Sequence, residues 1–127
     1  MFTNLDVFQT SYAMARHSGE RQAITAANMA NADTPNYRAR TLGSFADNYQ
    51  NSASGPMRTT REGHLGLGGA SNTARVQFSD AESSPNGNSV SLEQEMVNAV
   101  EIQREHSRAL AIYKHSLDVL RMSIGRR

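Results

Sequence analysis

The chain has 127 residues, of which 38% are apolar and 6% aromatic, with no Trp. This length suits one domain, and the low apolar content argues against a large core, so we expect neighbouring molecules to supply part of the burial. Thirteen basic and twelve acidic residues leave a net charge of +1, which predicts no strong field for nucleic acid or an anionic membrane. The absence of Cys excludes disulfides, thiolate nucleophiles and Cys-ligated metals.

Neither a cleaved secretory signal nor a membrane-spanning helix is expected. Residues 1–20 contain Asp6 and lack a basic start followed by an apolar stretch. No part of the chain approaches the roughly 18 consecutive apolar residues that a spanning helix needs. Export would therefore require another route.

Glycine and proline divide the chain into three segments. Seven of the nine glycines lie between Gly43 and Gly87, whereas the outer segments contain few residues that break helices. We therefore expect a helical N-terminal segment over residues 1–41, an irregular middle over residues 42–90 and a helical C-terminal segment over residues 91–127.

The N-terminal segment predicts one helix of roughly 27 residues that begins near Asn4. Thr3 and Asp6 have the spacing of a variant capping box, and Pro35 ends the helix because the residue before proline is pushed out of the α region. Apolar and small residues recur every three or four positions and form one stripe. The stripe and the small residues beside it are predicted to carry helix packing: Leu5, Phe8, Tyr12, Ala15, Gly19, Gln22, Ala23, Ala26, Met29 and Ala30.

The C-terminal segment predicts one helix of about 33 residues. Ser91 and Gln94 have the spacing of a capping box, and Gly125 is a stop signal. A heptad seam runs along this helix and is predicted to face the N-terminal helix: Leu92, Met96, Ala99, Gln103, His106, Leu110, Tyr113, Leu117, Leu120 and Ile124. The expected fold is mostly α, a coiled-coil-like hairpin of the terminal helices that is stable only when assembled.

The middle segment has few large apolar residues. Residues 75–79 alternate in the way of a strand. Residues 66–72 and 83–89 have loop compositions that could stay disordered in the free protein. At most a short β-hairpin is predicted here.

No residue pattern predicts a catalytic, cofactor or metal site. The four histidines include no pair three or four residues apart. The glycine-rich residues 63–69 lack the flanking strand, the flanking helix and the Gly-Lys-Ser/Thr ending of a phosphate loop. We therefore expect no enzyme activity, no cofactor and no small-molecule substrate. The arginines have no accompanying aromatic platform, which disfavours nucleic-acid binding.

Residues 26–40, AANMANADTPNYRAR, resemble the N-terminal signature of bacterial flagellar axial proteins, the family of rod, hook and filament-junction subunits. In physical terms this stretch is a helix of small residues followed by a Thr-Pro turn that directs Tyr37 sideways. The family usually has Gly where Asn36 stands, and Asn tolerates positive φ at some cost, so we expect the turn to be retained. The motif residues assigned to assembly are Asn28, Asn31, Asp33, Thr34, Pro35 and Tyr37.

Residues 5–8, 58–65, 87–96 and 120–125 extend the resemblance to the short proteins of the proximal rod. This resemblance implies a structural subunit of the periplasmic drive shaft that is required for motility. It also implies delivery through the flagellar type III export channel without a cleaved signal. The implied partners are copies of the chain, other rod subunits, and the inner-membrane ring adaptor and export apparatus at the rod base.

Two alternatives remain open at this point. A companion short rod protein is similar over the first forty residues and usually differs at its C-terminal end. A free-standing coiled-coil interaction module or an export chaperone of the flagellar system would share the helical pattern without entering a filament.

Overall fold

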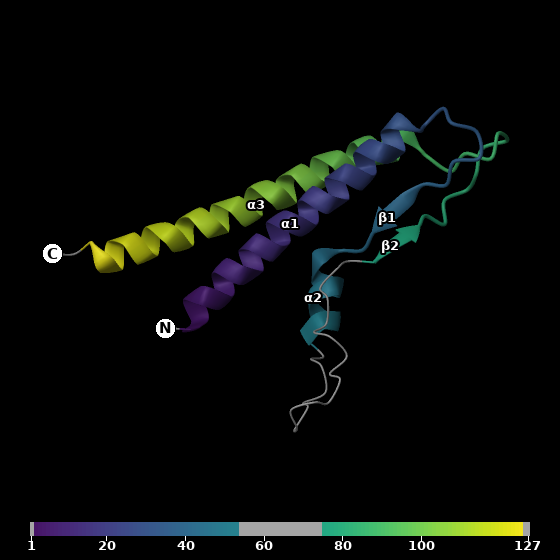
Figure 1. Ribbon diagram of the computed structural model, residues 1–127. Helices are drawn as coiled ribbons and strands as arrows, with labels where there is room; N and C mark the ends of the chain where they lie inside the picture. The colour runs from purple at the N-terminus through teal and green to yellow at the C-terminus, as the bar shows by residue number, and fades with distance from the viewer. Residues whose placement is uncertain (1, 54–74, 126–127) are drawn as a thin grey trace, which may run out of the picture.

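The structure, a computed structural model, describes residues 2–53 and 75–125, with side chains for residues 6–50 and 75–125. Its elements follow one another as α1 (Phe2–Ala30), β1 (Arg40–Leu42), α2 (Phe45–Ala53), β2 (Val76–Phe78) and α3 (Leu92–Ile124). The helices α1 and α3 run antiparallel side by side, so the start of α1 and the end of α3 lie at the same end of a long hairpin (Figure 1). The predicted fold class is confirmed.

The ends of both long helices are set by capping and turn residues. The helix α1 has 29 residues and begins at Phe2, two residues before the predicted start. Beyond its end Asn36 has a φ of 60°, which confirms the positive φ expected for this turn. The 33-residue helix α3 begins after Ser91, whose side chain accepts a hydrogen bond from the Gln94 amide, and ends at Gly125, whose N–H donates to the Arg121 carbonyl.

The middle segment contains more regular structure than predicted. The strand β2 lies in the stretch predicted to alternate, and it pairs antiparallel with β1, with Arg40 opposite Phe78. The nine-residue helix α2 corrects the expectation of an irregular segment. It forms because Ser44 caps it by accepting a hydrogen bond from the Asp47 amide at 3.2 Å, and because the Phe45 ring packs against α1.

The two predicted loops have different outcomes. The composition of residues 83–89 predicted a loop that could stay disordered, whereas in the structure this loop contains a hydrogen-bonded turn. In that turn the Gly87 amide donates to the Ser84 carbonyl and the Ser84 amide donates to the Asn88 carbonyl, each at 2.8 Å. The prediction for residues 66–72 lies outside the described residues.

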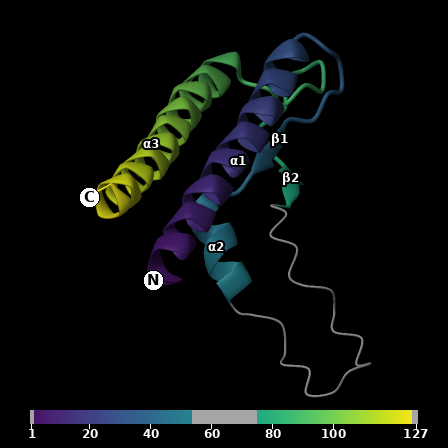
Figure 2. The same cartoon turned by 60° about the vertical axis from the view of Figure 1, so that its left-hand side comes forward.

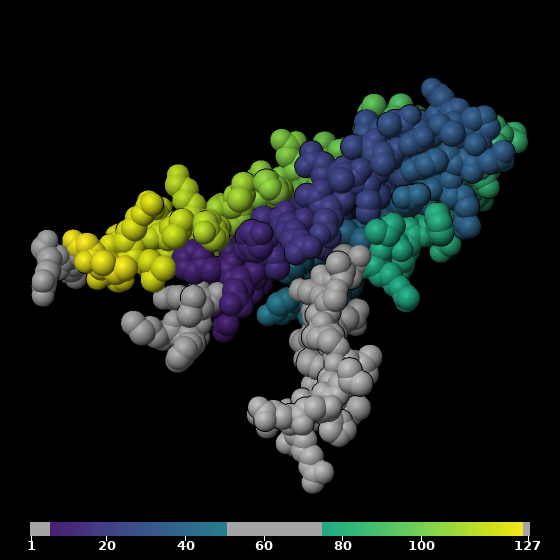
Figure 3. Space-filling view, viewed as in Figure 1, coloured from purple at the N-terminus to yellow at the C-terminus, as the bar shows by residue number. Residues whose placement is uncertain are grey.

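The strands and α2 occupy one side of the hairpin. Both β1 and α2 contact α1, whereas α3 contacts α1 and no other helix or strand among those described (Figure 2). The space-filling view shows the resulting long, narrow body, with β1 and α2 attached along α1 (Figure 3). Most of the circumference of α3 is therefore uncovered.

The interior is narrow and mostly polar. In residues 6–50 and 75–125 the buried apolar residues are Ala39, Leu42, Ile102 and Ala109. Buried polar or charged residues are twice as numerous: Ser11, His17, Ser18, Thr25, Asn28, Asn88, Ser89 and Glu95. Since the hydrophobic contribution to stability scales with buried apolar area, this interior contributes little to it.

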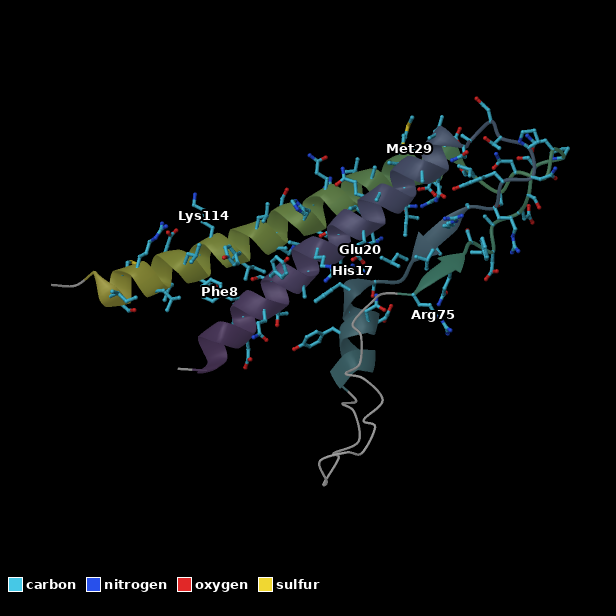
Figure 4. All side chains as sticks on the ribbon, in the orientation of Figure 1. Phe8, His17, Glu20, Met29, Arg75 and Lys114 are labelled. Carbon is cyan, nitrogen blue, oxygen red and sulfur yellow. The ribbon has the colours of Figure 1, made fainter. Side chains whose placement is uncertain are left out.

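His17 joins α1 to α2. Its side chain is buried, its Nε2 atom lies 3.0 Å from the Asn48 amide nitrogen, and its ring meets the edge of the Phe45 ring at 5.6 Å (Figure 4). Burial lowers the pKa of His17, the nearby Arg21 guanidinium lowers it further, and Glu105 and Glu20 partly oppose the shift. The folded chain therefore favours the neutral ring.

The small core predicts that the isolated chain is only marginally folded in dilute solution. The helical signal in far-ultraviolet circular dichroism and the midpoint of thermal unfolding should both rise with chain concentration, because contacts between copies add the missing burial. Full helicity with a cooperative melt that is independent of concentration would contradict this expectation.

The lowered pKa of His17 predicts acid sensitivity. Between the depressed folded pKa and the unfolded value near 6.5, the unfolded chain binds more protons than the folded chain. The free energy of unfolding should therefore fall as the pH drops below about 6.5, until the folded pKa is passed. Urea unfolding at a fixed chain concentration measures this effect. His17→Gln should flatten the pH dependence, whereas His115→Gln, at an exposed position, should leave it unchanged.

Candidate assembly surface

The two long helices contact each other through small and polar residues. The inner positions recur every seven residues on both helices: Ser11, Ser18 and Thr25 on α1, and Glu95, Ile102 and Ala109 on α3. The Ser18 hydroxyl donates to the Met14 carbonyl at 2.7 Å, so its polar group is satisfied within its own helix. Small side chains with internal hydrogen bonds let the two helices pack directly on each other.

Part of the predicted stripe and seam lies outside the contact between the two helices, which corrects the sequence prediction for these residues. Gly19 and Ala26 are exposed and come one position after the buried Ser18 and Thr25. In the same way Met96, Gln103 and Leu110 come one position after the buried positions of α3. One residue is about 100° around a helix, so these residues are rotated out of the interior by the same step on both helices. Small and polar residues occupy most of the inner positions, with Ile102 as the large apolar exception, while Met96 and Leu110 stay outside.

Both rotated patterns point to the same side of the hairpin. In an antiparallel pair of right-handed helices, the residues that follow the inner positions lie on one shared side. Arg21 and Glu105 each lie three positions after an inner residue, which points to the other side, and they form an ion pair there at 2.7 Å. We call the shared side the stripe surface, defined by Gly19, Ala23, Ala26, Ala30, Leu92, Met96, Gln103 and Leu110.

The stripe surface is exposed and uncharged. Leu92, Met96 and Leu110 are 41%, 52% and 49% exposed. A methyl group added at Gly19 would meet nothing within 4 Å, so no contact inside the chain requires a glycine there. Glycine costs about 1 kcal/mol relative to alanine within a helix. A neighbouring molecule that approaches α1 closely would account for the glycine at position 19. An extended apolar surface is also typical of an interaction site.

Other residues of the predicted pattern lie between or beyond the helices. The rings of Phe8 and Tyr113 meet edge to face across the hairpin at 5.2 Å (Figure 4). Leu117 and Leu120 are half-buried. Tyr12 and Ile124 are strongly exposed, at 67% and 81%. The side chain of Leu5 lies outside the described residues.

The loop after α1 is held by a second loop, residues 86–90, and we call this contact the clasp. The buried Asn88 amide donates to the carbonyls of Asn31, Ala32 and Thr34 at 2.9, 2.7 and 2.8 Å. The Asn36 amide donates to the Asn86 carbonyl, and the Ser89 amide donates to the Tyr37 carbonyl, each at 3.1 Å. Asp33, Thr34 and Pro35 are exposed. The clasp therefore fixes the backbone of the motif and leaves these side chains outside.

Asn28 joins three elements. Its amide nitrogen donates to the Arg40 carbonyl at 2.7 Å and to Glu95 Oε1 at 2.9 Å, while its oxygen accepts from the Arg40 amide at 3.0 Å and from the Tyr37 hydroxyl at 3.4 Å. Asn28 is 1% exposed, so these bonds replace water. Tyr37 thus folds back onto α1.

Sequence reasoning missed three residues of this junction: Asn88, Ser89 and Glu95. The Asn-Gly-Asn run at residues 86–88 lies in a stretch predicted to be a loop, and the structure makes a turn there in which Gly87 has a φ of +79°. The run did not indicate what the turn binds, because its partners lie more than fifty residues earlier in the chain. Glu95, in the first turn of α3, accepts the hydrogen bond from Asn28.

The part of the chain that the structure describes contains no group of three or more His, Asp or Glu side chains arranged to hold a metal ion. No described helix combines the length and apolar character needed to cross a membrane.

Comparison with known proteins gives the family. Residues 18–38, which carry the small residues of α1 and the clasped loop, match the model of the flagella basal body rod protein family. The flagellar basal body rod protein FlgB of Cereibacter sphaeroides is 30% identical over 105 residues, covering 82% of each chain. FlgB of Agrobacterium fabrum is 28% identical over 127 residues, covering 96% of this chain and 95% of that protein.

These relatives match along most of the chain, and the match to the Agrobacterium fabrum protein covers 96% of it, including its C-terminal half. They do not favour the companion protein, the free-standing coiled-coil module or the export chaperone. The chain belongs to the FlgB family of flagellar basal body rod proteins.

Proposed function

We propose that this protein is a non-enzymatic subunit of the proximal rod and that its stripe surface packs against neighbouring rod subunits. The observation that carries this assignment is the placement of exposed large apolar residues of α3 and small residues of α1 on one side of the hairpin. In a protein that acted alone, such a surface would stay in water and favour aggregation. In a rod it gains the burial that the hairpin lacks.

The surface combines two complementary shapes. The α1 half is flat, because it is made of Gly and Ala, and the α3 half carries Leu and Met side chains that extend from the helix. Large side chains of one helix pack well where small residues of another let the backbones approach. The proposed occupants are copies of this chain and other rod subunits.

The proposed location follows the function. A proximal rod subunit would lie in the periplasm, reach it through the flagellar export channel without a cleaved signal, and contact the inner-membrane ring adaptor and the export apparatus at the rod base. A chain with a small, mostly polar interior suits such a route, because it unfolds easily and regains stability on joining the rod.

The clasp sets the path of the chain as it leaves α1. Since Asn28 joins α1 to β1 and α3 and Asn88 holds the loop after α1, β1 leaves the hairpin in a fixed direction. We assign to the clasp the task of presenting the middle segment to neighbouring subunits on the outside of the rod.

A complementation experiment tests the function and the surface together. Deletion of the gene in its host should leave the membrane rings without rod and hook in images of isolated basal bodies, and the wild-type gene in trans should restore them. Met96→Asp should fail to restore them, because it places a charge in the stripe surface. Val97→Asp is the matched control, because Val97 is 54% exposed and points away from that surface.

The outcomes separate the two claims. Complete flagella in the deletion strain would contradict the rod function. Normal rods with Met96→Asp, or equal loss with both variants, would contradict the assignment of the surface while leaving the rod function intact.

The clasp predicts a second, local effect. Asn88→Ala removes the donor for three carbonyls, and an unsatisfied buried group costs about 1–3 kcal/mol. Hydrogen exchange at the Asn36 and Ser89 amides should accelerate by about tenfold or more, because these bonds close the clasp. Ser83→Ala, at an exposed position of the same loop, should not change their exchange. Unchanged exchange in Asn88→Ala would show that the amide does not hold the loop.

A further inference from the structure

The side of the hairpin opposite the stripe surface carries an apolar groove. It lies between the first half of α1 and the second half of α3, has a volume of about 220 Å³, and is lined by Asp6, Val7, Thr10, Ser11, Met14 and Ile112. Val7 and Ile112 are 40% and 41% exposed, so no described residue covers the groove. Its volume is several times the roughly 30 Å³ that one water molecule occupies, which leaves room for a branched aliphatic side chain.

The groove and the stripe surface lie on opposite sides of the same two helices. Thr10 precedes the inner position Ser11, and Ile112 comes three positions after Ala109, so both point to the side of the Arg21–Glu105 pair. Leu110 lies on the stripe surface and is 49% exposed. A copy can therefore offer its groove and its Leu110 to two different neighbours at the same time.

The charges next to each apolar residue of the stripe surface indicate which of these residues fits the groove. The charged residue that lines the groove is Asp6. Lys114 lies one turn after Leu110, projects from α3 away from α1, and forms no ion pair with any described residue (Figure 4). Leu92 and Met96 have Glu93 beside them and no basic residue within one turn. Arg121, one turn after Leu117, already lies 3.8 Å from Asp118.

We propose that the groove of one copy binds Leu110 of a second copy, with Lys114 of that copy beside Asp6. This inference rests on the proposed rod function and names the contact between copies. Because the groove and Leu110 lie on opposite sides, the contact is heterologous. Each copy binds one neighbour through its groove and another through its Leu110, which produces an open series of copies rather than a closed pair.

The natural absence of cysteine makes the contact directly testable. Cells that lack the gene would express Thr10→Cys and Leu110→Cys chains together, and isolated basal bodies would be oxidised and run on a non-reducing gel. A disulfide-linked dimer is expected, because a disulfide requires Cα atoms within about 7 Å. Thr10→Cys with Val97→Cys is the control and should give no dimer. Assembled rods without a Thr10–Leu110 dimer would overturn the contact.

A charge exchange tests the electrostatic half of the contact. Asp6→Lys and Lys114→Asp should each lower incorporation into basal bodies by about fivefold, and the double variant should restore it. Restoration also excludes a folding defect as the cause of the single losses. Additive losses in the double variant would overturn the proposed pairing. Absence of even the wild-type chain from purified basal bodies would instead contradict the rod function.

Discussion

The narrow contact between α1 and α3 constrains the rest of the structure. Small and polar side chains occupy most of the inner positions, with Ile102 as the large apolar exception, so the helices lie close together but bury little apolar area. Leu92, Met96 and Leu110 are not enclosed in this contact, because large side chains at every inner position would hold the backbones apart. Those residues remain outside, and the hairpin relies on polar bonds for its geometry. Ion pairing between Arg21 and Glu105 and the clasp at the far end supply those bonds.

The polar bonds are concentrated at one end of the hairpin. Asn28 satisfies the carbonyl and amide of Arg40 in β1, Asn88 satisfies carbonyls of the loop after α1, and both side chains are almost fully buried. At the opposite end the Phe8–Tyr113 ring contact joins the two helices. The chain thus has a well-fixed junction near the middle segment and a more open end near its termini, where the apolar groove lies.

Sequence reasoning located the elements better than it oriented them. The end of α1, the Ser91 cap, the length of α3 and the strand at residues 76–78 follow from local chemistry, which a sequence displays directly. The predicted facing side was wrong by one residue at Gly19, Met96 and Leu110, because hydrophobic periodicity identifies the apolar side of a helix and not the molecule that covers it. The helix α2 depends on contacts with His17, and the clasp depends on partners more than fifty residues away, so neither was visible locally.

An error of one residue on both helices, in the same sense, carries physical information. A chain under selection only to fold alone would place its largest apolar residues between its helices. Here Ser18 and Thr25 hold that place, while Gly19, Met96 and Leu110 are exposed at a cost to the isolated chain. That arrangement is favourable when neighbours cover the exposed side. The apolar groove on the opposite side gives each subunit a second, different surface for the proposed contact between copies. Two different surfaces on one subunit can join copies into an open series that does not close on itself.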